Sequence, residues 1–117
     1  MNFDLDEKYL AIQKEALRLT QSIENISTEA DACNEMHPGI LSALRDSKLA
    51  DLMVPSQYGG RFEKIDPLAI CLVREVMMAT SSHLDSLFAL QGIGSYAITV
   101  GGSSTQKEYW LPRVASA

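Results

Sequence analysis

Few side chains in this sequence have the type and spacing that catalysis or metal binding demands. The two histidines, His37 and His83, lie far apart, and neither has a Cys or His neighbour at metal-ligand spacing. We therefore expect surface or capping histidines. The two cysteines, Cys33 and Cys71, are too few for a disulfide framework or a metal cluster, which favours a reduced cytoplasmic protein.

Two further patterns differ from their catalytic forms. Gly92 and Gly94 have the spacing of part of a dinucleotide-binding motif, but that motif follows a strand and this region has a helical pattern. No serine lies in the strand-turn-helix elbow of a nucleophile. On residue chemistry alone, the sequence predicts a helical domain with no catalytic group and no metal site.

The composition is that of one globular domain. Its 117 residues and 46% hydrophobic content suffice for one core but not for two. The net charge of −5 argues against nucleic acid as a partner, because phosphates require clustered Lys and Arg. Residues 1–60 carry 10 acidic and 5 basic side chains, whereas residues 61–117 carry 5 of each. The early excess indicates a solvated acidic face.

The sequence has neither the pattern of a signal peptide nor that of a membrane-spanning helix. The acidic start lacks the basic and apolar regions of a signal peptide. The most apolar stretch, Leu84–Val100, contains Asp85 and Gln91 and is short of the roughly 20 residues of a spanning helix. We expect a cytoplasmic protein with no membrane span.

The first segment predicts a long amphipathic helix. Asp4 is its expected N-cap, and Glu7 lies three residues later, where a capping box places an acid. A stripe this long could also be a coiled-coil seam, but an ordinary bundle helix is favoured. The stripe consists of Leu5, Tyr9, Ile12, Ala16, Leu19, Ile23 and Ile26.

The middle of the chain predicts a loop, a short helix and an apolar helix. Residues 27–38 are polar, and apolar residues at helical spacing then predict a helix over 40–49. Asp66 followed by Pro67 is typical of a helix start. Because residues 68–79 are apolar apart from two charged side chains, we expect this helix to be surrounded by others.

A central helix follows. Ser82 begins it, and it runs to about Val100 before two glycines end it. Gly92 and Gly94 would each weaken an isolated helix by about 1 kcal/mol relative to alanine. Small residues at these positions suggest that another element approaches the backbone closely.

The last segment predicts a capped helix. Ser103 and Gln106 form a capping box for a helix through Trp110, and Pro112 should kink or end it. No stretch has the period-two pattern of a strand. The fold class expected for residues 1–117 is all-α, an orthogonal or up-down bundle of about five to six helices.

Three segments resemble the acyl-CoA dehydrogenase family. Residues 54–60, Val-Pro-Ser-Gln-Tyr-Gly-Gly, are similar to that family's Val-Pro-x-x-Tyr-Gly-Gly loop, whose glycines can take positive φ. Residues 102–112 resemble its Gly-Ser-x-x-Gln-Lys-x-x-x-Leu-Pro segment. The opening Phe3-Asp4-Leu5 before a long helix also fits. The resemblance covers the whole chain with matching order and spacing.

This resemblance implies a place within a larger enzyme. Family members have an N-terminal helical domain, a middle β-domain and a C-terminal helical domain. FAD lies mostly between the latter two, and the catalytic glutamate is in the C-terminal part. The chain ends where the middle domain would begin, so residues 1–117 match only the first domain. We expect this fragment to be inactive and not to retain FAD.

The resemblance also implies a substrate-binding wall on the fourth helix. Asp85, Ser86, Ala89 and Ile93 fall at positions that face the acyl pocket in the family. Each has a structural alternative: Asp85 could cap the helix through Ser82, and Ala89 and Ile93 could be core residues. The resemblance assigns no catalytic residue to this chain and leaves its cofactor-binding residues unknown.

Two departures from the family pattern bear on these expectations. Many relatives have two adjacent acids where this chain has Arg74-Glu75, which could alter a contact between domains. At position 89 bulkier or acidic residues close the pocket base in some relatives, whereas this chain has alanine. The resemblance therefore implies no particular acyl-chain length for the substrate.

The leading functional hypothesis is a domain of a flavin-dependent acyl-CoA dehydrogenase. The full enzyme would oxidise acyl-CoA to trans-2-enoyl-CoA, pass electrons to an electron-transfer flavoprotein, and form a homo-oligomer. One alternative is a flavin-dependent monooxygenase of the same fold. Another is a non-catalytic helical interaction module.

Overall fold

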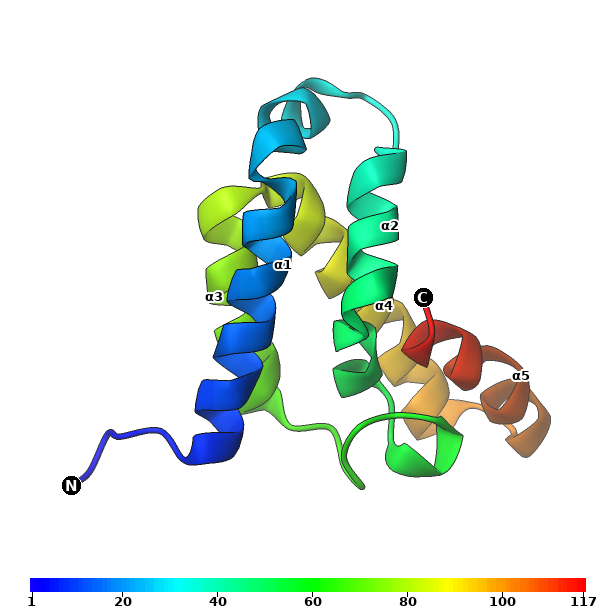
Figure 1. Cartoon of the computed structure of the whole chain (residues 1–117). Coiled ribbons are helices and arrows are strands. Elements are labelled where there is room, and N and C mark those ends of the chain that lie inside the picture. The colour runs from blue at the N-terminus through cyan, green and yellow to red at the C-terminus, as the bar shows by residue number, and fades with distance from the viewer.

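The computed structural model describes all residues, 1–117, and is built only from helices (Figure 1). An isolated bridge between Pro55 and Phe62 is its only strand-like pairing. The predicted all-α class is confirmed. The helices are α1 (Glu7–Ala32), α2 (Pro38–Ser47), η1 (Leu49–Met53), η2 (Ser56–Tyr58), α3 (Pro67–Thr80), α4 (Ser82–Gly101) and α5 (Ser104–Ala115).

The helices form a slab of 42 × 41 × 20 Å. Helix α1 packs mainly against α3 and α2, and α4 packs against α3 and α5. Figure 1 shows α5 set to one side, beside the C-terminal half of α4. Because a helix with its side chains is about 10 Å across, the slab is about two helices thick. Helices α3 and α4 each have an uncovered side, since Leu68 and Met78 of α3 and Leu90 and Val100 of α4 are exposed. The prediction that the helix over residues 68–79 is surrounded by others is therefore wrong within this chain.

Helix α1 follows the predicted stripe but has different ends. Ile12, Ala16 and Ile23 are buried within this chain, so the stripe is a bundle face. The N-cap is Asp6 rather than Asp4, and no side chain caps this end, so the predicted capping box is wrong. The helix extends to Ala32 instead of giving way to a loop at residue 27, because Ala30 is itself buried in the core.

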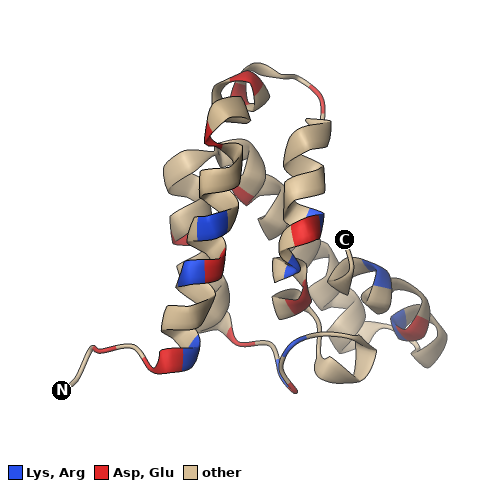
Figure 2. Ribbon diagram, viewed as in Figure 1, with Lys and Arg blue, Asp and Glu red and all other residues tan.

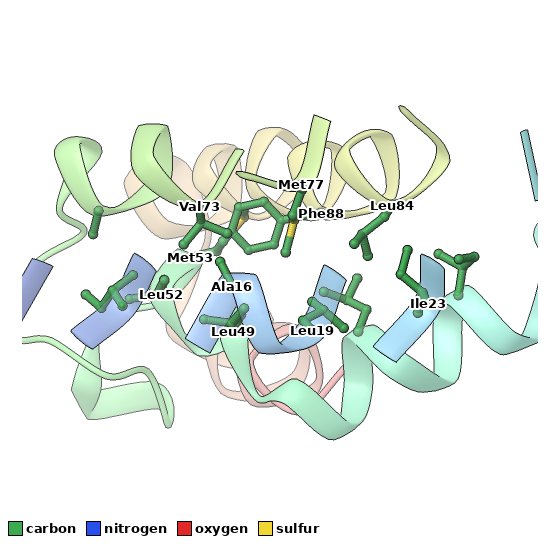
Figure 3. Packing of buried hydrophobic residues seen from close by; sticks show 14 of the residues in the cluster. Ala16, Leu19, Ile23, Leu49, Leu52, Met53, Val73, Met77, Leu84 and Phe88 are labelled. Carbon is green, nitrogen blue, oxygen red and sulfur yellow. The ribbon is translucent and has the colours of Figure 1, made fainter. Parts of the chain in front are cut away.

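The core lies where α1, α3 and α4 meet. Figure 3 shows the Phe88 ring of α4 beside Val73 and Met77 of α3, with Ala16 of α1 close to them. All four side chains are fully buried. Burial of one such large side chain stabilises the fold by about 1.5–3 kcal/mol. The same packing fixes how α3 and α4 lie against each other.

The expected helix over residues 40–49 is interrupted. Helix α2 ends at Ser47, and Lys48 takes a left-handed conformation with φ 64°. The chain then continues as the short helix η1, whose apolar residues are buried. The left-handed residue turns the chain so that η1 packs beneath α4 and α5.

The loop over residues 54–60 depends on both of its glycines. Gly59 has the expected positive φ, 96°. Gly60 does not, but a Cβ built on it would lie 1.4 Å from the carbonyl oxygen of Val54, so only glycine fits. Arg61 then ties the loop down, because it forms ion pairs with Glu15 at 2.6 Å and Asp51 at 3.0 Å.

Helix α5 begins as predicted and continues further. Ser103 and Gln106 form both hydrogen bonds of the capping box. The predicted end near Trp110 is wrong, since the helix passes through Pro112 to Ala115. Leu111 and Ala115 are buried against Val54, and this packing keeps the last turn helical. No helix of the protein is long and apolar enough to cross a membrane.

Candidate functional site

An apolar groove of about 280 Å³ lies between α3 and α4. Helix α4 contributes residues at spacings of three and four, which share one face of a helix. Helix α3 forms the opposite side. Six of the eight lining residues are hydrophobic; the set is Met53, Ile65, Ile70, Arg74, Ala89, Gly92, Ile93 and Tyr96.

A close approach between Gly92 and Met53 forms the floor of this groove. A Cβ on Gly92 would lie 2.3 Å from the sulfur of Met53, so a larger residue would displace that side chain. The predicted close approach is therefore confirmed at Gly92. It is wrong at Gly94, where an added Cβ would meet nothing within 4 Å.

Asp85 closes one end of the groove through Arg74. Its carboxylate accepts from Arg74 Nε at 2.9 Å and from Nη2 at 2.8 Å. These hydrogen bonds raise the pKa of the Arg74 guanidinium above its usual value. The capping alternative for Asp85 is wrong, because the N-cap of α4 is Ser81, whose hydroxyl accepts from the Leu84 amide.

The four residues expected at the acyl pocket lie in different surroundings. Ala89 and Ile93 both line the groove, Ala89 half-buried and Ile93 69% exposed, so the core alternative is wrong for Ile93. Asp85 is 2% exposed and reaches the groove only through Arg74. Ser86 lies in a separate shallow depression with His83 and others, away from the groove.

The two histidines meet although 46 residues separate them in sequence. The His37 side chain caps α2 by accepting from the Gly39 amide at 3.1 Å, as expected of a capping histidine. The His37 amide in turn donates to His83 Nε2 at 3.1 Å. No group of three or more His, Cys, Asp or Glu side chains could hold a metal ion.

The outer face of α4 is apolar and uncovered. The only charged residue of this helix is Asp85, and Figure 2 shows most charged residues on the other elements. Leu90, Ile93 and Val100 are each more than 60% exposed. A second groove of about 490 Å³ lies between α4 and α5, where Trp110 contributes to its wall. More of the exposed large hydrophobic residues lie on α4 than on any other helix.

Sequence reasoning missed Arg74 and Met53 as groove residues. Arg74 departs from the family pattern, and the available signal for it is a single basic residue within an otherwise apolar helix. Met53 gave no signal, because its position opposite Gly92 results from the turn at Lys48 and the packing of η1. Tyr96 was likewise indistinguishable from other apolar positions of α4.

Five α-helices, with an apolar groove between α3 and α4, define an all-helical domain. The chain belongs to the acyl-CoA dehydrogenase N-terminal domain family, whose profile matches residues 6–117. Cyclohexane-1-carbonyl-CoA dehydrogenase of Geobacter metallireducens is 29% identical over 94 residues, covering 80% of this chain and 24% of that protein. The chain thus spans about a quarter of the length of this curated relative.

Proposed function

We propose that this chain is the N-terminal domain of a flavin-dependent acyl-CoA dehydrogenase and forms one wall of its acyl pocket. The complete enzyme would oxidise acyl-CoA to trans-2-enoyl-CoA and pass the electrons to an electron-transfer flavoprotein. The observation that carries the proposal is the apolar groove at Ala89 and Ile93 on an uncharged helix face, in a chain of this family.

The chemistry explains why such a wall needs no catalytic side chain. Abstraction of a weakly acidic α-proton is helped by a dry site, where the base and the dipoles of the site are not screened by water. The residues of this chain would hold the hydrocarbon part of the thioester and exclude water. Each buried methylene contributes about 0.8 kcal/mol to binding.

The uncovered face of α4 has no group suited to bind the pyrophosphate of FAD. The exposed face of α4 is apolar, and the backbone N–H groups beyond its first turn are paired within the helix, so this face offers contact but no donors for a pyrophosphate. We therefore propose that FAD is held mainly outside this chain. The purified chain mixed with FAD should lose its flavin absorbance on gel filtration, and stoichiometric retention would contradict this.

The name of the curated relative suggests a substrate class for the proposal. That protein is named for a cyclohexane-1-carbonyl thioester. The α3–α4 groove is lined by Ile65, Ile70 and Ile93 and has a volume of about 280 Å³. Branched side chains around a short groove suit a compact acyl group, so we propose compact acyl-CoAs as the first substrates to assay.

The experiment is Ala89→Trp in the complete enzyme, assayed with acyl-CoAs of about four to sixteen carbons. If Ala89 faces the acyl chain, the indole occupies space meant for distal methylenes, so kcat/KM should fall more for longer substrates. Ala79→Trp, at an exposed position of α3 away from the groove, is the matched control. A loss that is equal at every length and follows a lower melting temperature would overturn the pocket-wall assignment.

The same preparation tests the alternatives. A monooxygenase would consume oxygen with reduced flavin and leave acyl-CoA saturated, and an interaction module would do neither. Assembly into a homo-oligomer and a cytoplasmic location also stay predictions. Sedimentation of the complete enzyme and cell fractionation would check them.

A further inference from the structure

Arg74, one of the residues that line the groove between α3 and α4, has N–H groups that no protein group accepts. A guanidinium carries five N–H groups, and Arg74 uses one on Nε and one on Nη2 for Asp85. The remaining three, including both on Nη1, have no acceptor in the protein. The Arg74 side chain is 47% exposed and is one of the groove-lining residues, so these donors are open to solvent or to a ligand at the groove.

Arg74 is the only charged side chain along this groove. The rest of the lining is apolar apart from the phenol of Tyr96 at the other end. Asp85, which anchors Arg74, precedes Ala89 by one helical turn, or about 6 Å along α4. An apolar cleft with one fixed polar group is the usual arrangement when that group selects and orients a ligand.

The charge of the pair restricts what the free donors can bind. Arg74 and Asp85 are neutral together, and the carboxylate is buried. An anionic ligand would leave one net negative charge in a site from which the rest of the proposed enzyme would exclude water, and an uncompensated charge is unfavourable there. A neutral oxygen satisfies the donors and leaves no net charge.

We infer that Arg74 is a specificity-determining residue that selects acyl thioesters with a neutral oxygen acceptor on the distal part of the acyl group. A hydroxyl, ether or ketone oxygen has this chemistry. The inference rests on the proposed function, since that function places the acyl chain against α4. Asp85 is a positioning residue, because it holds the guanidinium without touching the ligand.

The test compares saturated acyl-CoAs with their ω-hydroxy counterparts, chain length by chain length, in the complete enzyme. We expect the kcat/KM ratio of hydroxy to plain substrate to reach about tenfold at the length whose end meets Arg74. The test variant is Arg74→Met/Asp85→Leu, which removes the donors without leaving a buried carboxylate unpaired. In this variant the kcat/KM ratio of hydroxy to plain substrate should fall below one at every acyl-chain length.

A binding readout and a charge control accompany the kinetics. S-alkyl-CoA thioethers with and without an ω-hydroxyl cannot be oxidised, and calorimetry should give the same preference from their Kd values. Lys64→Met removes one positive charge at an exposed position outside the groove and should leave both ratios unchanged.

The outcomes separate this inference from the function on which it rests. Oxidation of plain acyl-CoAs without a hydroxyl preference at any length overturns the role of Arg74 alone. If the double variant loses activity equally on all substrates, and the kcat/KM ratio of hydroxy to plain substrate is unchanged, then Arg74 has only a structural role. If the enzyme prefers acyl-CoAs with an ω-carboxylate, the claim that Arg74 selects a neutral oxygen acceptor is overturned. Oxidation of no acyl-CoA overturns the proposed function and this inference together.

Discussion

Arg74 of α3 and Asp85 of α4 form a two-pronged ion pair, with N–O distances of 2.9 and 2.8 Å. The Asp85 side chain is 2% exposed, whereas the Arg74 side chain is 47% exposed. Asp85 has no other side-chain partner. The pair is therefore asymmetric, because only Arg74 compensates the charge of the buried Asp85 carboxylate. The two residues also join α3 to α4 at the end of the groove.

Removal of Arg74 should therefore cost more than removal of both partners. Arg74→Met leaves a buried carboxylate unpaired, and we expect the free energy of unfolding to fall by about 2–3 kcal/mol. Arg74→Met/Asp85→Leu should recover most of this loss, because a hydrophobic replacement carries no desolvation penalty. Urea denaturation of both variants at neutral pH measures the difference, and equal losses would contradict the asymmetry.

Gly60→Ala and Gly94→Ala should have opposite effects on stability. At Gly60 the added methyl would lie 1.4 Å from the Val54 carbonyl oxygen, so the loop must rearrange and the chain should lose about 3 kcal/mol or more. At Gly94 the methyl meets nothing within 4 Å, and alanine should stabilise α4 by about 0.5–1 kcal/mol. Melting temperatures of the two variants decide this, and a neutral Gly60→Ala would contradict the predicted clash.

The hydrogen bond from Tyr9 to Asp66 should make stability depend on acid pH. Tyr9 Oη donates to Asp66 Oδ2 at 2.7 Å, and this bond, aided by the Ala69 and Leu68 amides, holds the pKa of Asp66 below its usual value. A carboxylate with a lowered folded-state pKa contributes stability above its unfolded pKa of about 4, and this is lost as the pH falls through the folded value.

Tyr9→Phe should thus lower the free energy of unfolding at neutral pH, because the Asp66 carboxylate loses its hydrogen-bond donor. The gap between wild type and variant should narrow as the pH falls below about 4. Tyr58→Phe is the control, because the Tyr58 hydroxyl makes no hydrogen bond to a carboxylate, so its effect should not depend on acid pH. Calorimetric melting across the acid range provides the measurement, and a constant gap would disprove the link to Asp66.

The uncovered face of α4 should cause the isolated chain to self-associate. Leu90 is 63% and Val100 67% exposed on a helix with no exposed charge, and contiguous surfaces of this kind are usually covered by a partner. Leu90→Lys/Val100→Lys should shift the chain toward monomer in light scattering. Leu10→Lys, on the charged helix α1, should leave the association unchanged. A wild-type chain that stays monomeric at high concentration would contradict the prediction.

The sequence alone determined the features that are encoded within a few neighbouring residues. The α1 stripe, the Asp66 cap and the Ser103–Gln106 capping box all formed as their spacing predicts. Each involves groups no more than one helical turn apart, so local geometry suffices to bring them together. The motifs over residues 54–60 and 102–112 likewise identified the family from short segments.

The tertiary structure decided which distant residues meet. His37 and His83, Arg74 and Asp85, and Met53 and Gly92 are paired by the packing of separate helices, and no periodicity in the sequence specifies those contacts. The same packing carried α1 beyond residue 27 and α5 beyond Pro112, because buried contacts outweigh weak local preference at helix ends. Whether a residue of α4 faces the groove, the core or solvent was therefore settled only when α3 and η1 packed against it.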